Sequence, residues 1–263
     1  MIGSRLEAGG PLCRQDAGAH LRIAIVGLGQ VGGSLALALR KSKIAIEIIG
    51  IDVSSRRLRL LKETLDHSSS NWKDAEKCDL IFLCMHFQQI VKFLDQTRTD
   101  SLLVDVCSGK EKIISQANRR KLRFIGGHPM AGNEREGERG WDAALFDKAP
   151  FFLCPGKFSK RSDLTQIKKL IQLIHANPIV VNPQQHDEFV ALTSHLPAFL
   201  SVAYRDFSNS VPASFQGPGY KSFTRLAQTS PQLLKTFRES NARNITKQWK
   251  KWLGVLKRKS VHR

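Results

Sequence analysis

The chain has 263 residues and carries 41 Lys and Arg against 23 Asp and Glu, which gives a formal net charge of +18 at pH 7. Hydrophobic residues make up 41% of the chain and charged residues 24%, a balance typical of globular proteins that excludes a disordered chain. No apolar run approaches the roughly 18–20 residues of a membrane-spanning helix, so we expect no membrane association.

The N-terminus and the cysteines indicate the cellular compartment. Residues 1–20 lack the apolar core of a secretory signal and are expected to form a flexible leader. The five cysteines are odd in number and include no CxxC pair, which argues against a disulfide framework and against a zinc site. We therefore predict a cytoplasmic protein that holds no metal.

From residue 21 onward, short apolar runs alternate with helical patterns of roughly ten residues. The predicted strands are 21–27, 46–52, 79–85, 101–106, 123–127 and 150–154. The predicted helices between them are 31–41, 54–65, 87–97 and 110–120. Such alternation indicates βαβ units, and hence an α/β fold with a doubly wound parallel sheet of the Rossmann type.

After Pro155 the pattern becomes mainly helical. The segment NPIVVNP at 177–183 offers at most one short strand. The predicted helices are 162–176, 184–207, 220–229 and 231–257. We therefore predict a dinucleotide-binding Rossmann domain at 21–155, followed by an α-helical domain for substrate binding and dimerisation at 156–263.

The segment 27–32 matches the pattern GxGxxG between the first predicted strand and the first predicted helix. Gly27 permits the tight turn, Gly29 lets a pyrophosphate approach the backbone, and Gly32 allows close packing of helix and strand. Asp52 ends the second strand, where a carboxylate accepts hydrogen bonds from the adenosine ribose. With the helix N-terminus donating N–H groups to phosphates, the predicted cofactor site comprises Gly27, Gly29, Gln30, Val31, Gly32 and Asp52.

Asp52 also bears on which dinucleotide binds. A carboxylate at this position repels the 2′-phosphate of NADP, so the sequence favours NAD. Arg56 and Arg57 leave NADP open, because guanidinium groups pair well with phosphate. As solvated residues in the first turn of the next helix, they would have no such role. NAD is the predicted cofactor.

Two polar segments follow the predicted strands 101–106 and 123–127, at the edge where open α/β sheets bind ligands. They are DVCSGK at 105–110 and GGHPMAGNE at 126–134. Three more motifs lie further along, namely ALFDKAPFFLCP at 144–155, SHLP at 194–197 and GYKSFTRLA at 219–227. With these motifs the chain resembles the prephenate/arogenate dehydrogenase family of tyrosine biosynthesis, over residues 21–257.

The resemblance implies an NAD-dependent oxidoreductase that acts on a small anionic substrate. In that family the ring hydroxyl of prephenate or arogenate loses its proton while a hydride passes from the same carbon to NAD+. Carbon dioxide then leaves as the ring becomes aromatic. The enzyme needs a base at the hydroxyl, a hydrogen-bonding group beside it and cations for the carboxylates.

The resemblance also assigns roles to individual residues. His128 would be the base, a task that suits an imidazole because it titrates near neutral pH. Ser108 would form a hydrogen bond beside it, and it could also cap the helix that follows. Arg225 would hold a substrate carboxylate with its planar guanidinium, and Lys221, one helical turn earlier, could assist.

For two further residues, Glu134 and His195, the sequence leaves two interpretations open. Glu134 either polarises the pocket or is a solvated loop residue, and His195 either lines the pocket or is a satisfied interior histidine. The chain departs from the family at Ala198, where a histidine is common, and at Leu234, where some members have tryptophan. Cys107 would lie beside the nicotinamide. These departures leave open prephenate, arogenate or another cyclohexadienyl compound as the substrate.

The basic excess is concentrated near the C-terminus, because residues 220–263 contain twelve Lys or Arg and one acidic residue, Glu239. Such a charge could indicate an NAD-sensing or nucleic-acid-binding protein without enzymatic activity. No helix-turn-helix, zinc finger or RNA-binding signature accompanies it, so we predict no nucleic-acid partner. In the family the helical domain forms a homodimer, and the amphipathic segment 231–257 could contribute to that interface.

Overall fold

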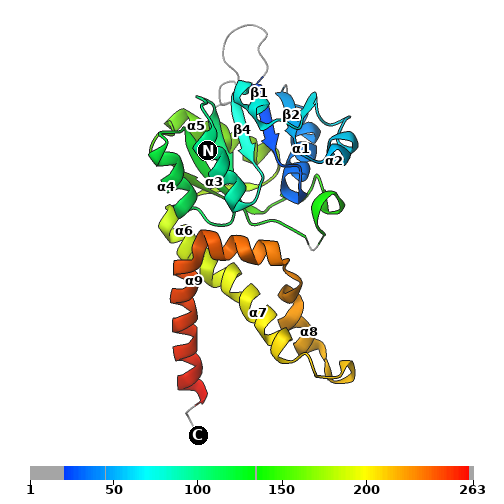
Figure 1. The fold of residues 1–263 in the computed structure, drawn as a ribbon, viewed down its shortest axis with the longest axis vertical. Coiled ribbons are helices and arrows are strands. Elements are labelled where there is room, and N and C mark those ends of the chain that lie inside the picture. Colours follow the sequence, from blue (N-terminus) through cyan, green and yellow to red (C-terminus); the bar gives the residue numbers. More distant parts are fainter. Residues whose placement is uncertain (1–20, 45, 134, 261–263) are drawn as a thin grey trace, which may run out of the picture.

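The computed structural model describes residues 21–44, 46–133 and 135–260, which are built on one eight-stranded sheet (Figure 1). The strands are β1 Leu21–Val26, β2 Ile46–Ile51, β3 His67–Ser69, β4 Leu80–Leu83, β5 Leu102–Asp105, β6 Phe124–Pro129, β7 Pro150–Pro155 and β8 Asn177–Val180. Their spatial order is β3-β2-β1-β4-β5-β6-β7-β8. All neighbours are parallel except β6 and β7. The order of the first six is that of a Rossmann fold, so the predicted fold class is confirmed.

Helices cover both faces of the sheet, as the alternating pattern predicted. Because successive strand residues point to opposite faces, Ile23 and Ile25 of β1 pack in one hydrophobic cluster and Ala24 and Val26 in the other. The first cluster includes residues of α1 and α5, and the second includes residues of α3 and α4. The helices of this part are α1 Gln30–Lys41, α2 Ser55–Leu60, α3 Phe87–Gln96, α4 Glu111–Arg119 and α5 Arg161–Leu173.

The sheet extends further along the chain than predicted. The boundary expected after residue 155 falls inside it, because α5 leads from β7 to β8, which pairs in parallel with β7. β8 forms the edge of the sheet and is largely exposed, and its apolar run is limited to residues 179–181, so the sequence predicted at most one short strand there. The opposite edge strand, β3, was missed because its three residues, HSS, include no apolar one. The leader expected at residues 1–20 lies outside the described residues.

The rest of the described chain is helical and extends away from the sheet (Figure 1). The predicted helix 184–207 is interrupted by a π-helical turn at Ala191–His195. The last helix is kinked at Asn241, whose φ of −137° is not helical. The helices are α6 Pro183–Val190, α7 Leu196–Phe207, α8 Pro218–Thr224 and α9 Pro231–Ser260. None of the helices in the described ranges is long and apolar enough to cross a bilayer.

Candidate functional site

The glycine-rich loop lies at the carboxyl ends of β1 and β4, where the strand order reverses. Gly27 has a φ of +93°, and a Cβ there would lie 2.5 Å from the backbone oxygen of Cys84. A Cβ on Gly32 would lie 1.9 Å from the oxygen of Gly27. At Gly29, by contrast, no heavy atom lies within 4 Å of the Cβ position, so its backbone is open to a ligand. The loop therefore fits a pyrophosphate, which needs this close approach.

Asp52 lies just after β2, beside the glycine-rich loop, and is only 7% exposed. Its Oδ2 accepts a hydrogen bond from the backbone N–H of Leu28 at 2.7 Å, and its Oδ1 accepts one from Ser54 at 2.8 Å. These bonds fix the carboxylate at the position expected of a ribose ligand. The structure thus places Asp52 beside the glycine-rich loop.

A segment that follows β6 covers the start of α1. The Gln30 side-chain amide donates to the backbone oxygens of Asn133, at 3.0 Å, and Arg135, at 2.5 Å. The Trp141 indole N–H donates to the oxygen of Gly29 at 3.0 Å. We call residues 135–141 the cover loop. Because the side-chain amide of Gln30 is engaged there, only the backbone N–H of Gln30 is available to a phosphate. The predicted site residue Glu134 lies outside the described residues.

His128 lies near the end of β6 and is 9% exposed. Its Nδ1 is 2.9 Å from Nε2 of His186, and Nδ1 of His186 is 2.8 Å from Oδ1 of Asp187. The Asp187 carboxylate also accepts hydrogen bonds from the backbone N–H groups of Lys110 and Glu111, at 2.8 and 2.9 Å, at the start of α4. A buried chain of three side chains therefore connects His128 to a helix N-terminus.

The hydrogen bonds of this chain assign the imidazole protons. Asp187 is an acceptor, so Nδ1 of His186 carries a proton and its Nε2 accepts one from Nδ1 of His128. This leaves Nε2 of His128 with a lone pair. Burial above all, and then the neighbouring His186, Lys110 and His195, disfavour a positive charge on His128 and lower its pKa well below its usual value. His128 is therefore a neutral base at physiological pH.

Three buried side-chain atoms have no hydrogen-bond partner within the described part of the protein, namely Oγ of Ser108, Nε2 of His195 and Oγ1 of Thr236, and the first two belong to predicted site residues. Nδ1 of His195 lies 3.3 Å from the amide nitrogen of Asn241, which can only donate, so the proton of His195 is on Nε2. A buried polar group without a partner costs about 1–3 kcal/mol. The two atoms are therefore suited to bind a polar ligand.

The π-helical turn Ala191–His195 determines where His195 lies. The wider turn is a feature that often occurs at functional sites. It places the His195 ring against Phe237 of α9, with ring centroids 4.1 Å apart and planes at 21°. At the kink of α9, the side-chain amide of Asn241 also donates to the backbone oxygen of Asp187 at 2.7 Å. The helical part thus closes over the carboxyl edge of the sheet.

Not all of the predicted residues are brought together. His128, Ser108 and His195 are buried, whereas Lys221 of α8 and Arg225, just after α8, are exposed. His186 and Asp187, in the middle of the amphipathic helix α6, were not predicted from the sequence. The available signal was an adjacent histidine and aspartate shortly before the SHLP motif.

We expect the free energy of unfolding to fall as the pH is lowered from 6.5 to about 4, in part because of His195. Burial lowers the pKa of His195 from 6.5 to about 4, so the unfolded chain binds this proton before the folded protein does. Above pH 6.5 the imidazole is neutral in both states and the depressed pKa has no effect; below that pH it lowers the free energy of unfolding by about 3 kcal/mol in all through this window. Urea unfolding of the wild type and of His195→Gln would measure it, and the decline should be shallower in the variant. Parallel declines in the two proteins would contradict this role of His195.

Comparison with known proteins gives concordant matches. The family model described as "Prephenate dehydrogenase, nucleotide-binding domain" matches residues 35–180, and "Prephenate dehydrogenase, dimerization domain" matches residues 182–260. The first match begins at residue 35, after the glycine-rich loop at 27–32. The loop therefore indicates a dinucleotide site independently of this match. The two models meet next to the end of β8, at residue 180, rather than at residue 155.

Curated relatives match most of the length of the chain. The chain is 27% identical over 251 residues to prephenate dehydrogenase of Bacillus subtilis, a match that spans 88% of this chain and 67% of that protein. It is 29% identical over 223 residues to prephenate dehydrogenase of Lactococcus lactis, spanning 79% of this chain and 61% of that protein. The chain thus spans roughly two thirds of the length of these relatives.

Solved structures confirm the fold. The complex of prephenate dehydrogenase from A. aeolicus with hydroxyphenyl propionate and NAD+ matches with a TM-score of 0.82 and 24% identity, over 92% of this chain and 90% of that one. Synechocystis arogenate dehydrogenase matches with a TM-score of 0.75 and 24% identity, over 90% of both chains.

Proposed function

The chain belongs to the prephenate dehydrogenase family, and from this we propose that it catalyses the NAD-dependent oxidative decarboxylation of prephenate or arogenate. The observation that carries the proposal is the buried chain His128–His186–Asp187 at the edge of the sheet that also carries the glycine-rich loop and Asp52. Oxidation of a carbinol removes a proton from its hydroxyl and a hydride from its carbon. This requires a neutral base beside a dinucleotide site.

His128 acts on the ring hydroxyl. Its Nε2 takes the hydroxyl proton as the carbinol becomes a carbonyl, and His186 stabilises the imidazolium that forms. A bound nicotinamide would supply the acceptor for the hydride of the same carbon. Loss of carbon dioxide then makes the ring aromatic, and the proton on His128 can return to the phenolate oxygen. The balance is one substrate and NAD+ giving a phenol, carbon dioxide and NADH.

The unpartnered groups would orient the substrate. Oγ of Ser108 would form a hydrogen bond with the reacting hydroxyl, and the N–H of His195 would donate to a carboxylate or carbonyl oxygen; both atoms are buried without a partner among the described residues. Burial of these atoms excludes water, which strengthens such bonds. Arg225 and Lys221 are proposed as cations for the substrate carboxylates, on the evidence of the motif GYKSFTRLA.

The cofactor would be held mainly by the backbone. Gly27 and Gly32 shape the loop, Gly29 and the first N–H groups of α1, at Gln30 and Val31, would meet the pyrophosphate, and Asp52 would accept hydrogen bonds from the ribose. Among the residues that the structure describes, no side chain caps this end of α1, and its first turn holds no acidic residue. Those N–H groups therefore remain available to a phosphate.

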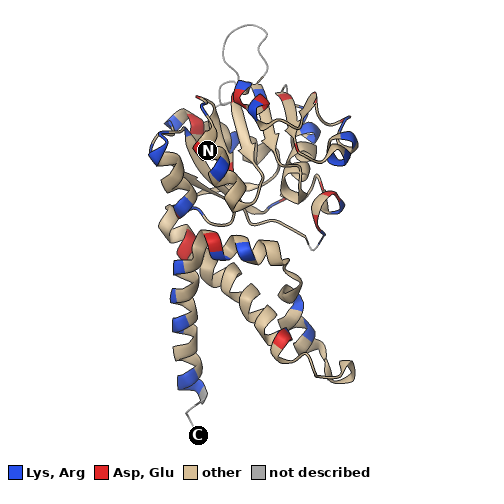
Figure 2. Ribbon diagram, viewed as in Figure 1, with Lys and Arg blue, Asp and Glu red and all other residues tan. Residues whose placement is uncertain are grey.

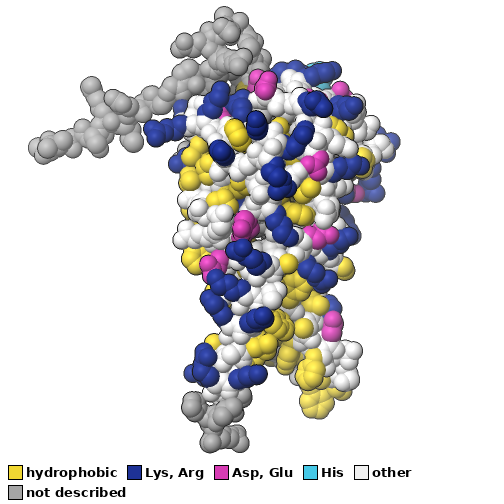
Figure 3. All heavy atoms as spheres, turned by 60° about the vertical axis from the view of Figure 1, so that its left-hand side comes forward, with side chains coloured by type: hydrophobic (Ala, Val, Ile, Leu, Met, Phe, Trp, Pro, Cys, Tyr) yellow, Lys and Arg dark blue, Asp and Glu magenta, His cyan; other side chains and the backbone are white. Residues whose placement is uncertain are grey.

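We further propose that the chain forms a homodimer through its helical part, whose matching family model is described as a dimerization domain. Large apolar side chains are exposed on these helices and their connections, where Figure 3 shows hydrophobic surface. They include Phe189, Leu192, Phe207, Phe215 and Phe223, with exposures of 50–85%. Apolar surface of this kind marks an interaction site.

The basic residues of α9 are compatible with an enzyme that acts on an anionic substrate, and they do not require a nucleic-acid partner. Between Asn241 and Ser260 the helix carries seven Lys or Arg and no acidic residue (Figure 2). A positive field of this kind raises the local concentration of an anionic substrate. Prephenate carries two carboxylates, so its association rate should fall as the ionic strength rises.

The proposal is tested by incubating the purified protein with NAD+ and either prephenate or arogenate while the absorbance of NADH is followed. We expect turnover with at least one of them, and the ratio of the two kcat/KM values identifies the substrate. If NAD+ binds but neither compound is oxidised, the proposal is wrong. The buried Ala198, where the family often has histidine, would then favour another cyclohexadienyl substrate.

A further inference from the structure

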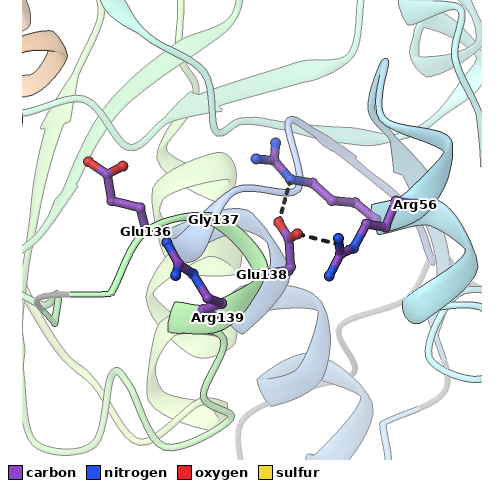
Figure 4. Close-up of a pocket in the computed structure, with 6 residues that line it drawn as sticks. Arg56, Glu136, Gly137, Glu138 and Arg139 are labelled. Carbon is purple, nitrogen blue, oxygen red and sulfur yellow. Dashed lines mark hydrogen bonds and ion pairs between the residues drawn. The ribbon is translucent and has the colours of Figure 1, made fainter.

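A second group of charged residues lies next to the cofactor site. A pocket at the surface is lined by six residues, of which five are charged: Arg56, Arg57, Glu136, Gly137, Glu138 and Arg139 (Figure 4). Arg56 and Arg57 come from the first turn of α2, just after Asp52. The other four belong to the cover loop, which includes a short helical turn at Gly137–Gly140.

Glu138 bridges the two arginines. Its Oε1 is 3.4 Å from Nε of Arg56, and its Oε2 is 3.3 Å from Nε of Arg57. Nη1 of Arg57 is also 3.4 Å from Oδ2 of Asp52. Figure 4 shows the Glu138 carboxylate between two guanidinium groups. Arg57 therefore lies between the carboxylate expected to bind the ribose and a second carboxylate from the cover loop.

The position of Glu138 is fixed by the loop that carries it. The cover loop is anchored to the start of α1 through the bonds of Gln30 and Trp141. Gly137 has a φ of +59°, and a Cβ there would lie 3.1 Å from Nη2 of Arg57, so the backbone lies close against this arginine. The Glu138 backbone N–H and the Arg57 side chain lower the pKa of Glu138, which is therefore ionised at neutral pH.

Two arginines beside a ribose-binding carboxylate have the chemistry of a site for a 2′-phosphate. A bound phosphate ester would carry about −1.5 to −2 charges at this place, whereas Glu138 supplies one. To bind between the arginines, the phosphate would have to displace Glu138 and then remain near it. NAD, which has a hydroxyl in place of the phosphate, has no need of the arginines.

We infer that Glu138 occupies the place of the 2′-phosphate between Arg56 and Arg57, and thereby selects NAD against NADP. The inference rests on the proposed function only in that the chain must bind a nicotinamide dinucleotide. It assigns the selection to two carboxylates: Asp52, which the GxGxxG motif predicts, and Glu138, which lies 86 residues later in the chain. It also gives Arg56 and Arg57 a role, since without Glu138 they would favour NADP.

The test is to measure the dissociation constants of NAD+ and NADP+ for the wild type and for Glu138→Gln, by isothermal titration without substrate. Glutamine keeps the shape of the side chain and removes its charge. We expect NADP+ to bind about tenfold or more tightly to Glu138→Gln than to the wild type, with NAD+ changed by less than about threefold. Adding Arg57→Ala to Glu138→Gln should remove the gain.

Glu136→Gln is the matched control, because it removes the same charge from the same loop but not from the bridge. It should leave the ratio of the two dissociation constants unchanged. The inference is overturned if Glu138→Gln leaves the ratio at its wild-type value, which would make the bridge a surface ion pair only, or if the wild type already binds NADP+ as tightly as NAD+. A wild type that binds neither dinucleotide would instead overturn the proposed function, and this inference with it.

Discussion

Replacing His128 with asparagine is expected to lower kcat by a factor of about 10² to 10⁴, the usual contribution of a general base. Asparagine can keep a hydrogen bond toward His186 but has no nitrogen lone pair to accept the hydroxyl proton. The KM should change much less than kcat, because the lost interaction forms only as the proton moves. Steady-state kinetics with saturating NAD+ measures both constants.

The pH profile of the wild type provides a second measurement of the same role. Because the pKa of His128 is well below its usual value, the base is already deprotonated at neutral pH. The kcat should rise with pH in the range below 6.5, the ordinary pKa of histidine, and should be constant above it. This rise should be absent from the residual activity of His128→Asn.

The control for His128→Asn is His175→Asn. His175 is exposed and has a φ of +61°, a conformation that asparagine tolerates well. This variant should keep wild-type kcat and KM. Full activity in His128→Asn would refute the assignment of the base, and an equal loss in both variants would show that the effect is not specific to the site.

The fold was largely predictable because most of its strands are buried on both faces. Strands such as β1 and β4 appear in the sequence as continuous apolar runs, and the local motif at 27–32 fixes the cofactor end of the sheet. The two edge strands, β3 and β8, were the difficult ones, since exposed strands need no apolar run. The domain boundary was placed too early because β8 gave so little signal.

The candidate site was predictable only where one short segment contains it. Gly27, Gly29 and Asp52 belong to a motif with known spacing, and His128 follows a strand that could be recognised. The partners of His128 are 58 and 59 residues away in the chain, and only the packing of α6 on α4 brings them near. The same holds for Glu138 and its arginines. Contacts across the sheet edge depend on tertiary structure, which a sequence pattern does not encode.

The second large effect concerns a buried ion pair beneath the site. Lys110 is completely buried, and its Nζ donates to Oδ2 of Asp105 at 2.5 Å and to the backbone oxygen of Gly127 at 2.6 Å. Asp105 is also completely buried and accepts backbone hydrogen bonds from Cys107 and Gly127. The pair thus links the end of β5 to the residue before His128.

We expect Lys110→Met to lower the free energy of unfolding by about 3–5 kcal/mol, because it leaves the Asp105 charge buried without a partner. Adding Asp105→Asn to this variant should recover part of the loss, because it removes the buried charge. Asparagine keeps one acceptor oxygen, which serves the N–H of Cys107 or of Gly127 but not both, since the two bond to different oxygens of Asp105. Urea unfolding of the wild type, the single variant and the double variant gives the three values.

The dependence of the loss on pH separates an uncompensated charge from poor packing. Burial already raises the pKa of Asp105, and Lys110 opposes that shift. Without Lys110 the pKa should rise further, so that the folded variant takes up a proton more readily than the unfolded chain does as the pH falls. The deficit of Lys110→Met should therefore shrink at lower pH, whereas a packing defect would stay constant. A deficit independent of pH, with no recovery in the double variant, would show that Lys110 stabilises the protein by filling space and not by its charge.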